Sequence, residues 1–262
     1  MATTMEADPT ISAPNPLLLA SELMRAGLEF CSIPLFAPGL LSAPRGDGHP
    51  VVVLPGFATT DAATTVLRGF LSSLGYEVHP WQLGRNMGPK TLGPARKLLT
   101  DRIAAIADEA GRAVSLVGWS LGGVMARQVA AAHGEDIRQI ITIGSPFTGN
   151  PYATHLWRIY ETAAGISFSD PVTQVDLAEG AAVPDAPSTA IFSKIDGITA
   201  WENCIDPLSD NTDCVQVIGS HMGLPHNPAV LMLIAERLAQ AEGEWQHFDA
   251  SRMPIPALYP AH

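Results

Sequence analysis

The stretch that decides the fold is SLVGWSLGGVMARQ, residues 115–128. It continues the apolar run AVSLV, which is typical of a buried strand, and it ends in a helical pattern. Between the two, Gly118, Ser120 and Gly122 form G-x-S-x-G, a sharp strand-to-helix turn that exposes one serine hydroxyl. Glycines must flank the serine because the helix passes close to the strand. The turn also puts Ser120 at a helix N-terminus, where developing negative charge is favoured.

Outward from this turn, apolar segments alternate with helical patterns. The predicted strands are 49–57, 76–83, 113–118, 137–144, 188–194 and 214–220. Helices are predicted over 61–75, over 94–110, after Ser120, and from Pro228 behind an Asn227 cap. Strands that are apolar throughout, separated by amphipathic helices, predict an α/β fold with a mainly parallel sheet covered on both faces. Sites in such sheets lie at the carboxyl ends of the strands.

A serine hydroxyl becomes a nucleophile only when a base removes its proton, and the base needs an acid to orient it. His221 directly follows the last predicted strand, which favours it as the base over His226. Asp196 follows the strand 188–194 and is the predicted acid, with Gly197 suited to a turn. Asp206, in the next loop, is expected to be solvated. His49, which has no matching position, is expected in a loop or at the surface.

The tetrahedral intermediate of such a reaction needs two N–H donors for its oxyanion. One is predicted to be the backbone N–H of Leu121, the residue after the nucleophile. The other should come from the turn after the first strand, LPGF (54–57). Because Pro55 has no N–H, Phe57 is the predicted donor, and Gly56 permits the sharp turn.

About forty residues separate the strands that end near 144 and begin near 188, too many for an ordinary connection. We expect an inserted helical cap or lid over 147–187, with a helix that starts at Asn150 and Pro151. It can pack firmly on the sheet edge, form the substrate site with its apolar underside, or do both. The residues predicted to contact substrate are Trp119, Tyr152, Leu156, Trp157 and His226.

The chain has 262 residues and a net charge of −11. This length suits one domain over 46–262, with residues 1–45 as an N-terminal arm and helix packed on it. The acidic balance argues against nucleic acid as a partner. The helical segment 16–30 is too short and too charged to span a bilayer, so it is expected to pack, or to contact a second copy or a membrane interface. Residues 1–16 resemble no export signal, which favours the cytoplasm.

The three cysteines, Cys31, Cys204 and Cys214, fit no metal-binding spacing. Cys204 and Cys214 could close a small loop or remain reduced thiols, and the second alternative is favoured. No GxGxxG or P-loop follows the first strand, and no histidines have the spacing of metal ligands. No metal or cofactor is therefore predicted.

Together these pieces resemble the α/β-hydrolase superfamily, in particular its bacterial lipase- and esterase-like members. VVVLPGF is similar to the lipase oxyanion segment, and ITIGSPFTG resembles the stretch after the strand that follows the elbow. SKIDGIT and GSHMGL look like its acid and histidine turns. Many lipases carry a histidine before the oxyanion glycine, where this chain has Pro55.

The expected function is hydrolysis of an uncharged, hydrophobic carboxylic ester through an acyl-enzyme on Ser120. An acyltransferase, a thioesterase or an amidase could use the same residues. A non-catalytic binder of hydrophobic ligands is the alternative from another class.

Overall fold

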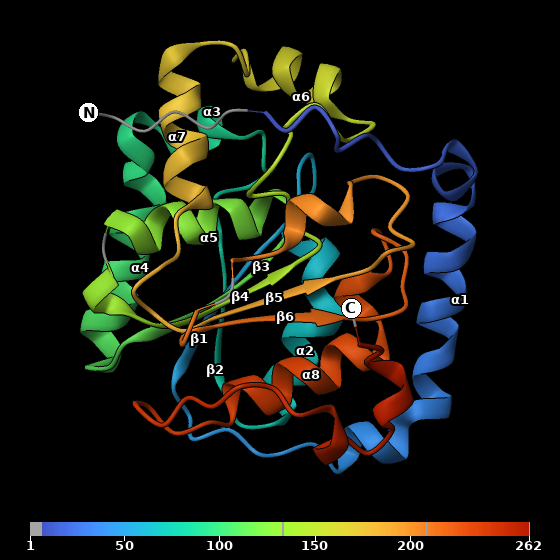
Figure 1. Cartoon of the computed structure of the whole chain (residues 1–262). Coiled ribbons are helices and arrows are strands. Elements are labelled where there is room, and N and C mark those ends of the chain that lie inside the picture. Colours follow the sequence, from blue (N-terminus) through green and yellow to red (C-terminus); the bar gives the residue numbers. More distant parts are fainter. Residues whose placement is uncertain (1–6, 133, 208, 262) are drawn as a thin grey trace.

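The computed structural model describes residues 7–132, 134–207 and 209–261. Within these ranges, six strands form one parallel sheet in the order β2-β1-β3-β4-β5-β6. The strands are β1 Pro50–Leu54, β2 Glu77–Pro80, β3 Val114–Trp119, β4 Ile137–Ile143, β5 Ser188–Phe192 and β6 Thr212–Gln216. The predicted α/β fold with a mainly parallel sheet is confirmed (Figure 1).

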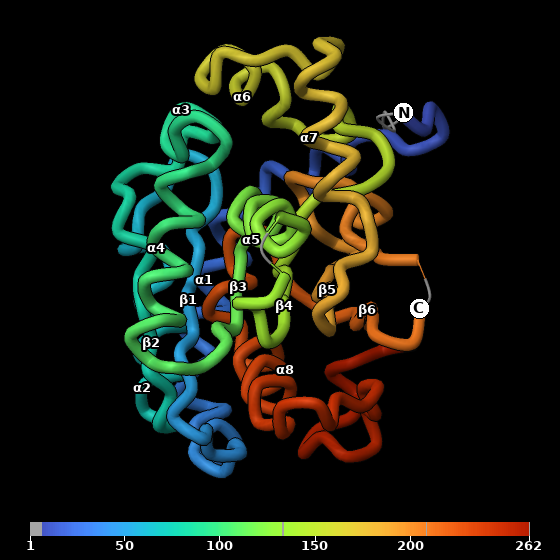
Figure 2. The backbone as a smooth tube through the Cα atoms, turned by 90° about the vertical axis from the view of Figure 1, so that its left-hand side faces the viewer, coloured from blue at the N-terminus to red at the C-terminus, as the bar shows by residue number. Residues whose placement is uncertain are grey.

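Helices cover both faces of the sheet, since successive side chains of each strand point to opposite sides. Val51 and Val53 of β1 belong to the apolar cluster that includes α2 and α8. Val52 and Leu54 belong to the cluster on the other face, with α4 and α5 (Figure 2). These helices are α2 Thr65–Ser73, α4 Lys97–Ala110, α5 Leu121–Ala132 and α8 Pro228–Leu238. Short 3-10 turns, Asp61–Thr64 and Pro94–Arg96, replace the predicted first turns of α2 and α4.

The chain changes direction across the sheet between β1 and β3. From β1 it crosses to β2 on one side, and then returns to place β3 on the other side of β1. The loops that follow β1 and β3 therefore diverge to opposite faces and leave a crevice at the carboxyl edge. Phe57 and Ser120 follow these two strands, so the topology brings them together.

The long insertion between β4 and β5 forms α6 Trp157–Ala164 and α7 Pro171–Ala181, which lie over α5 and the short α3 Pro89–Leu92 at this edge (Figure 1). The predicted helix start at Asn150 is wrong, because α6 begins seven residues later. The carbonyl and the backbone N–H of Asn150 are held by the side chain of Asn203, at 2.7 and 2.9 Å. The division into an arm, a domain and a lid stays a prediction.

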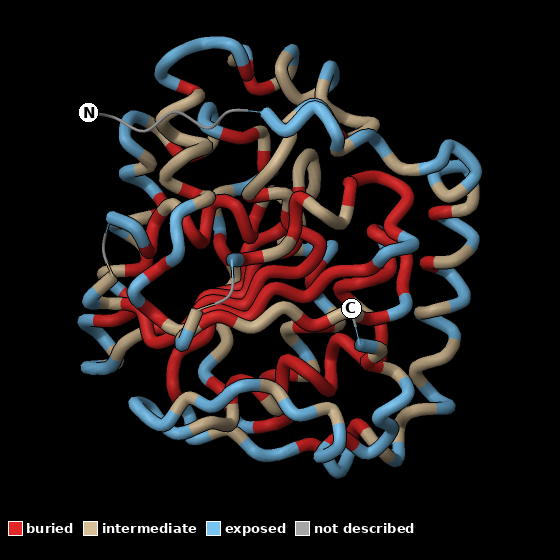
Figure 3. Tube along the Cα trace, viewed as in Figure 1, coloured by how far each residue is buried: buried red, intermediate tan, exposed pale blue. Residues whose placement is uncertain are grey.

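Helix α1 runs over Pro16–Leu41, further than the predicted 16–30, and the Asn15 side chain caps it by accepting a hydrogen bond from the Leu17 N–H. The apolar side of its first turns is not the side that packs. Leu17, Met24 and Leu28 are 76%, 65% and 64% exposed, whereas Glu22 is buried. The exposed and buried sides of α1 are visible in Figure 3. The side that carries Glu22 contacts a set of backbone N–H groups, which carboxylates satisfy and leucines do not.

The loop before β6 corrects another expectation, because Asp206 is buried rather than solvated. Its Oδ2 accepts a hydrogen bond from Arg127 Nη1 at 2.9 Å. Arg127, on α5, also donates to the carbonyls of Gly180 and Ala182 at the end of α7. A buried guanidinium needs a carboxylate to compensate its charge, which explains why Asp206 leaves solvent. Cys204 and Cys214 are both free.

Candidate active site

Ser120 lies in a strained turn between β3 and α5. Its φ is 53°, a left-handed conformation that is costly for any residue other than glycine. The flanking glycines permit the close approach that was predicted. A Cβ on Gly118 would lie 2.4 Å from the backbone of Gly123, and one on Gly122 would lie 2.4 Å from the carbonyl of Leu54. The turn therefore holds the serine hydroxyl at the N-terminus of α5.

The structure brings Ser120, His221 and Asp196 together from three loops. His221 Nε2 lies 3.0 Å from Ser120 Oγ, and His221 Nδ1 lies 2.6 Å from Asp196 Oδ2. Asp196 Oδ1 accepts hydrogen bonds from the N–H groups of Ile198 and Thr199, both at 2.8 Å. These two bonds fix the carboxylate, which in turn selects the histidine tautomer with hydrogen on Nδ1. The remaining nitrogen, Nε2, is then free to accept the serine proton.

The surroundings of His221 favour its protonated form. Burial alone would lower its pKa, but the charge of Asp196, the hydrogen bond to Asp196 and the charge of Glu22 outweigh burial and raise the pKa above 6.5. A base with a raised pKa accepts a proton more readily. The position of His221 needs one correction: β6 ends at Gln216, so His221 lies five residues beyond the strand rather than directly after it.

The two residues whose amides are predicted to hold an oxyanion, Phe57 and Leu121, follow β1 and β3 and line the same cavity as Ser120. The turn that carries Phe57 is fixed by the buried Asn86, whose side chain donates to the Pro55 carbonyl at 2.8 Å and whose carbonyl accepts from the Ala58 N–H at 2.7 Å. Sequence reasoning missed this support, because a lone asparagine in LGRNMGP gives no signal of burial.

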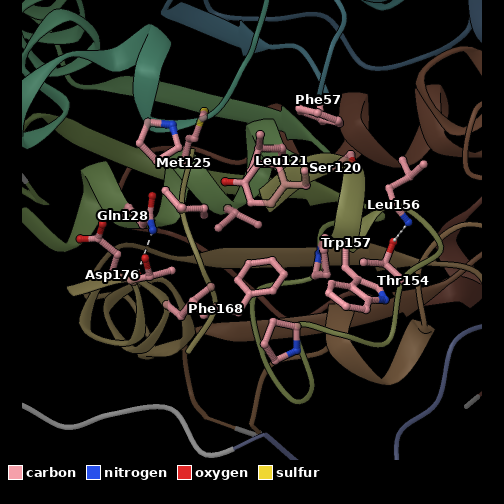
Figure 4. A pocket seen from close by; sticks show the side chains of 18 of the residues that line it. Phe57, Ser120, Leu121, Met125, Gln128, Thr154, Leu156, Trp157, Phe168 and Asp176 are labelled. Atoms are coloured by element: carbon pink, nitrogen blue, oxygen red, sulfur yellow. Dashed lines mark hydrogen bonds between the residues drawn. The ribbon is translucent and has the colours of Figure 1, made fainter. Parts of the chain in front are cut away.

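A cavity of about 420 Å³ opens beside Ser120. It follows one face of α5, formed by Leu121, Val124, Met125 and Gln128, and is covered by α6 and α7. Figure 4 shows Ser120 and Phe57 at one end and Gln128 and Asp176 at the other. Gln128 lies two turns along α5 from Ser120, and its amide donates to the Asp176 carbonyl at 2.8 Å. The lining is mostly apolar, as in sites for small hydrophobic ligands.

The residues predicted to contact substrate divide into two groups. Leu156 and Trp157 line the cavity, whereas Tyr152 packs edge-on against the Trp157 ring.

Trp119 and His226 are not among the residues that line the cavity. The Trp119 side chain belongs to the apolar cluster with α2 and α8, and its Nε1–H donates to the His221 carbonyl at 3.1 Å. The His226 ring bonds to the Ala26 carbonyl on α1. Among lining residues that the prediction missed, Tyr160 and Phe168 stack on each other.

A second Asp–His–Ser constellation lies at the opposite edge of the sheet. His49 Nδ1 is 2.5 Å from Asp47 Oδ1, and His49 Nε2 is 2.8 Å from Ser115 Oγ. His49 and Ser115 are both fully buried, so His49 lies in a loop, as expected, but away from the surface. Burial is the main cause that lowers the pKa of His49. Ser115 lies inside β3 rather than at a strand-to-helix turn, so this constellation is a structural network that joins the buried His49 and Ser115 to the exposed Asp47.

Among the described residues, no three His, Cys, Asp or Glu side chains lie close enough to hold a metal ion. In the same part of the chain, no helix combines the length and apolar character that a membrane crossing requires.

Comparison with known proteins identifies the family to which the chain belongs. A model described as the Alpha/beta hydrolase family matches residues 51–259. A pimeloyl-[acyl-carrier protein] methyl ester esterase of Shewanella woodyi is 32% identical over 100 residues, which make up 38% of this chain and 37% of that protein. The match thus spans little more than a third of that relative.

Solved structures agree in fold. Aspergillus fumigatus lipase B superposes with a TM-score of 0.55 at 17% identity, covering 83% of this chain and 58% of that one. MGS-MChE2, an alpha/beta hydrolase enzyme from a sediment metagenome of the Mar Chica lagoon, Morocco, gives 0.52 at 21% identity, covering 73% and 91%. At such identities the likeness extends to the fold alone.

Proposed function

Because the chain belongs to the alpha/beta hydrolase family, we propose that it hydrolyses carboxylic esters through an acyl-enzyme on Ser120. The observation that carries the proposal is the hydrogen-bonded series from Asp196 through His221 to Ser120, which ends at the mouth of an apolar cavity. The esterase and lipase names among its relatives support the choice of ester over other acyl compounds.

In the proposed reaction, Ser120 Oγ attacks the ester carbonyl while its proton moves to His221 Nε2. The carbonyl oxygen becomes an oxyanion, which the N–H groups of Phe57 and Leu121 stabilise. The intermediate collapses, the C–O bond to the alcohol breaks, and the alcohol leaves with the proton from Nε2. A water then gives a proton to His221 Nε2 and attacks the acyl carbonyl. The bond between the acyl carbon and Ser120 Oγ breaks, Oγ takes the proton back from Nε2, and the carboxylic acid leaves. Asp196 stabilises the imidazolium in both halves.

The cavity supports an uncharged acyl group of medium length. From Leu121 to Gln128 the helix α5 advances about 10 Å, at 1.5 Å per residue. An extended chain advances roughly 1.2 Å per bond, so this length fits about eight carbons. Each methylene that leaves water contributes about 0.8 kcal/mol, or roughly fourfold in kcat/KM. We propose that residues 147–187 act as the lid over this group.

The first test combines a covalent probe with an ester series. We expect a fluorophosphonate to label Ser120, and kcat/KM for p-nitrophenyl esters to rise from two carbons to about eight and then fall. Thioester, amide and alcohol-acceptor substrates measured in parallel decide among hydrolase, amidase and acyltransferase. A folded protein that the probe leaves unlabelled would favour the non-catalytic binder.

Leu177 of α7 offers a test of the cavity itself. It lines the cavity and follows Asp176 in the chain, which Figure 4 shows at the end remote from Ser120. Leu177→Trp should shorten the cavity and move the preferred acyl chain to fewer carbons, whereas Leu177→Ala should move it to more, each changing the ratio of kcat/KM for long and short esters roughly tenfold. Because the two variants are expected to act in opposite directions, each serves as the control of the other. A chain-length profile that neither alters would place the acyl group elsewhere.

Contact through α1 with a second copy or with a lipid interface remains a proposal. Its support is the exposed apolar side, which includes Leu17, Met24, Leu28 and Leu35.

A further inference from the structure

Helix α1 lies against the turns that carry Asp196 and His221, and it contacts them with an acidic side chain. Glu22 is only 2% exposed. Its Oε1 accepts hydrogen bonds from the backbone N–H groups of Gly197, at 2.8 Å, and His221, at 3.1 Å. Its Oε2 accepts from the N–H of Met222 at 3.0 Å. One carboxylate thus joins the residue after the acid to the backbone of the base.

Two further charged residues on the same face of α1 extend this contact. Arg25 Nη2 pairs with Glu22 at 2.7 Å, and Arg25 Nη1 donates to the Ile195 carbonyl at 2.7 Å. Glu29 Oε1 accepts from both the N–H and the hydroxyl of Ser220, each at 2.7 Å. Spacings of three and four residues put these side chains on one side of a helix.

Two glycines permit this close approach. A Cβ on Gly197 would lie 2.5 Å from the backbone of Leu18, and a Cβ on Gly223 would lie 2.4 Å from the Glu29 carboxylate. Neither glycine has a positive φ. Gly197 was predicted to serve a turn, but its backbone needs no special conformation. Its small size instead leaves room for the backbone of α1.

We propose that Glu22 is a positioning residue, which holds the His221 backbone in register with Asp196 and stabilises the protonated imidazole by its charge. This inference rests on the proposed function only for its effect on turnover. A carboxylate buried as deeply as Glu22 is costly unless its oxygens are paired, and the three N–H groups and Arg25 pair them. An apolar residue would pack at this position without satisfying those N–H groups.

The charges around His221 determine how its pKa should change when Glu22 is replaced by a neutral residue. Asp196 and Glu22 bond to His221 itself, Glu29 bonds to the neighbouring Ser220, and Arg25 is paired with Glu22. From β3 and the turn after it, the uncharged Trp119 and Ser120 face the ring. His226, on the turn Leu224–His226, points to α1 instead. Burial lowers the pKa of His221, and the negative charges of Asp196 and Glu22 raise it. Removing the Glu22 charge removes one of the causes that raise this pKa, so the pKa should fall.

The test is Glu22→Gln, which keeps the shape and removes the charge. We expect kcat to fall roughly 10- to 100-fold with KM little changed, as for a small displacement of a catalytic group. The acidic limb of the pH profile of kcat/KM, and the His221 pKa measured by NMR titration, should both move to lower pH. Glu22→Asp keeps the charge but retracts the carboxylate, so we expect a lower kcat with the raised His221 pKa retained.

Matched variants on the same helix separate charge from packing. Glu29→Gln should lower kcat while the His221 pKa stays near that of the wild type, because Glu29 contacts Ser220 instead. Leu23→Ala, at an exposed site of the same helix, should change neither. A folded Glu22→Gln with wild-type kcat and wild-type His221 pKa overturns the proposal. If Glu22→Gln does not fold, a folded Glu22→Asp variant with the wild-type kcat overturns the proposal instead. The NMR titration needs no substrate, so a chain that cleaves no ester would refute the proposed function while this readout still tests Glu22.

Discussion

Ser120→Ala is expected to lower kcat for the preferred ester about 10⁶-fold, or roughly 8 kcal/mol, because no other group can form the acyl-enzyme. His221 and Asp196 act through the Ser120 hydroxyl, so mutating them in addition to Ser120 should lower kcat little further. The measurement is single-turnover and steady-state hydrolysis of a p-nitrophenyl ester, with circular dichroism and thermal unfolding to show that the fold persists. Fluorophosphonate labelling should disappear in the same variant.

Ser115→Ala is the matched control for this experiment. Ser115 also forms a hydrogen bond with a histidine that is bonded to an aspartate: its Oγ lies 2.8 Å from His49 Nε2. Unlike Ser120, it is fully buried inside β3. We expect this variant to keep its activity and its labelling, and to lose about 1 kcal/mol of stability through the lost hydrogen bond. Turnover retained in Ser120→Ala, or lost in Ser115→Ala at full folding, would contradict the assignment.

The comparison of these two serines also shows what sequence could predict. Ser120 was recognisable because the demands of a strained turn are local: glycines on both sides, a strand before and a helix after. The parallel sheet followed from apolar strands, and the partners of Ser120 followed from the rule that strand ends share an edge. His49 and Ser115 have no such local signature, since Asp47, His49 and β3 meet only when the sheet is assembled.

The contacts of α1 were unpredictable for a related reason. Periodicity assigns the packing face of a helix to its apolar side, which is correct when the partner is a hydrophobic core. Here one side of α1 contacts a row of backbone N–H groups on the loops of Asp196 and His221, and these groups need acceptors. The inward face therefore carries Glu22 and Glu29, while Leu17 and Leu28 remain exposed. The same holds for Asp206, whose partner Arg127 is 79 residues away.

Asp196→Asn is expected to lower kcat about 10⁴-fold with little loss of stability. The carboxamide has one oxygen, which can still accept from the N–H groups of Ile198 and Thr199. The group that faces His221 Nδ1 is then either the NH₂ donor or, if the amide turns over, a carbonyl oxygen that is a weaker acceptor than a carboxylate. An NH₂ donor at that position selects the tautomer with hydrogen on Nε2, which cannot take the proton of Ser120. Loss of the negative charge also lowers the pKa of His221, since that charge is one of the causes that raise it.

The two effects can be separated by pH. A lower His221 pKa moves the acidic limb of kcat/KM to lower pH, whereas the wrong tautomer lowers the plateau at every pH until hydroxide replaces the base. Asp210→Asn, at an exposed position in the loop before β6, is the matched control and should leave both plateau and limb unchanged. A folded Asp196→Asn whose plateau stays within tenfold of the wild type would mean that another carboxylate orients His221. Glu22 would then be the first residue to test, because its charge lies against the same loop.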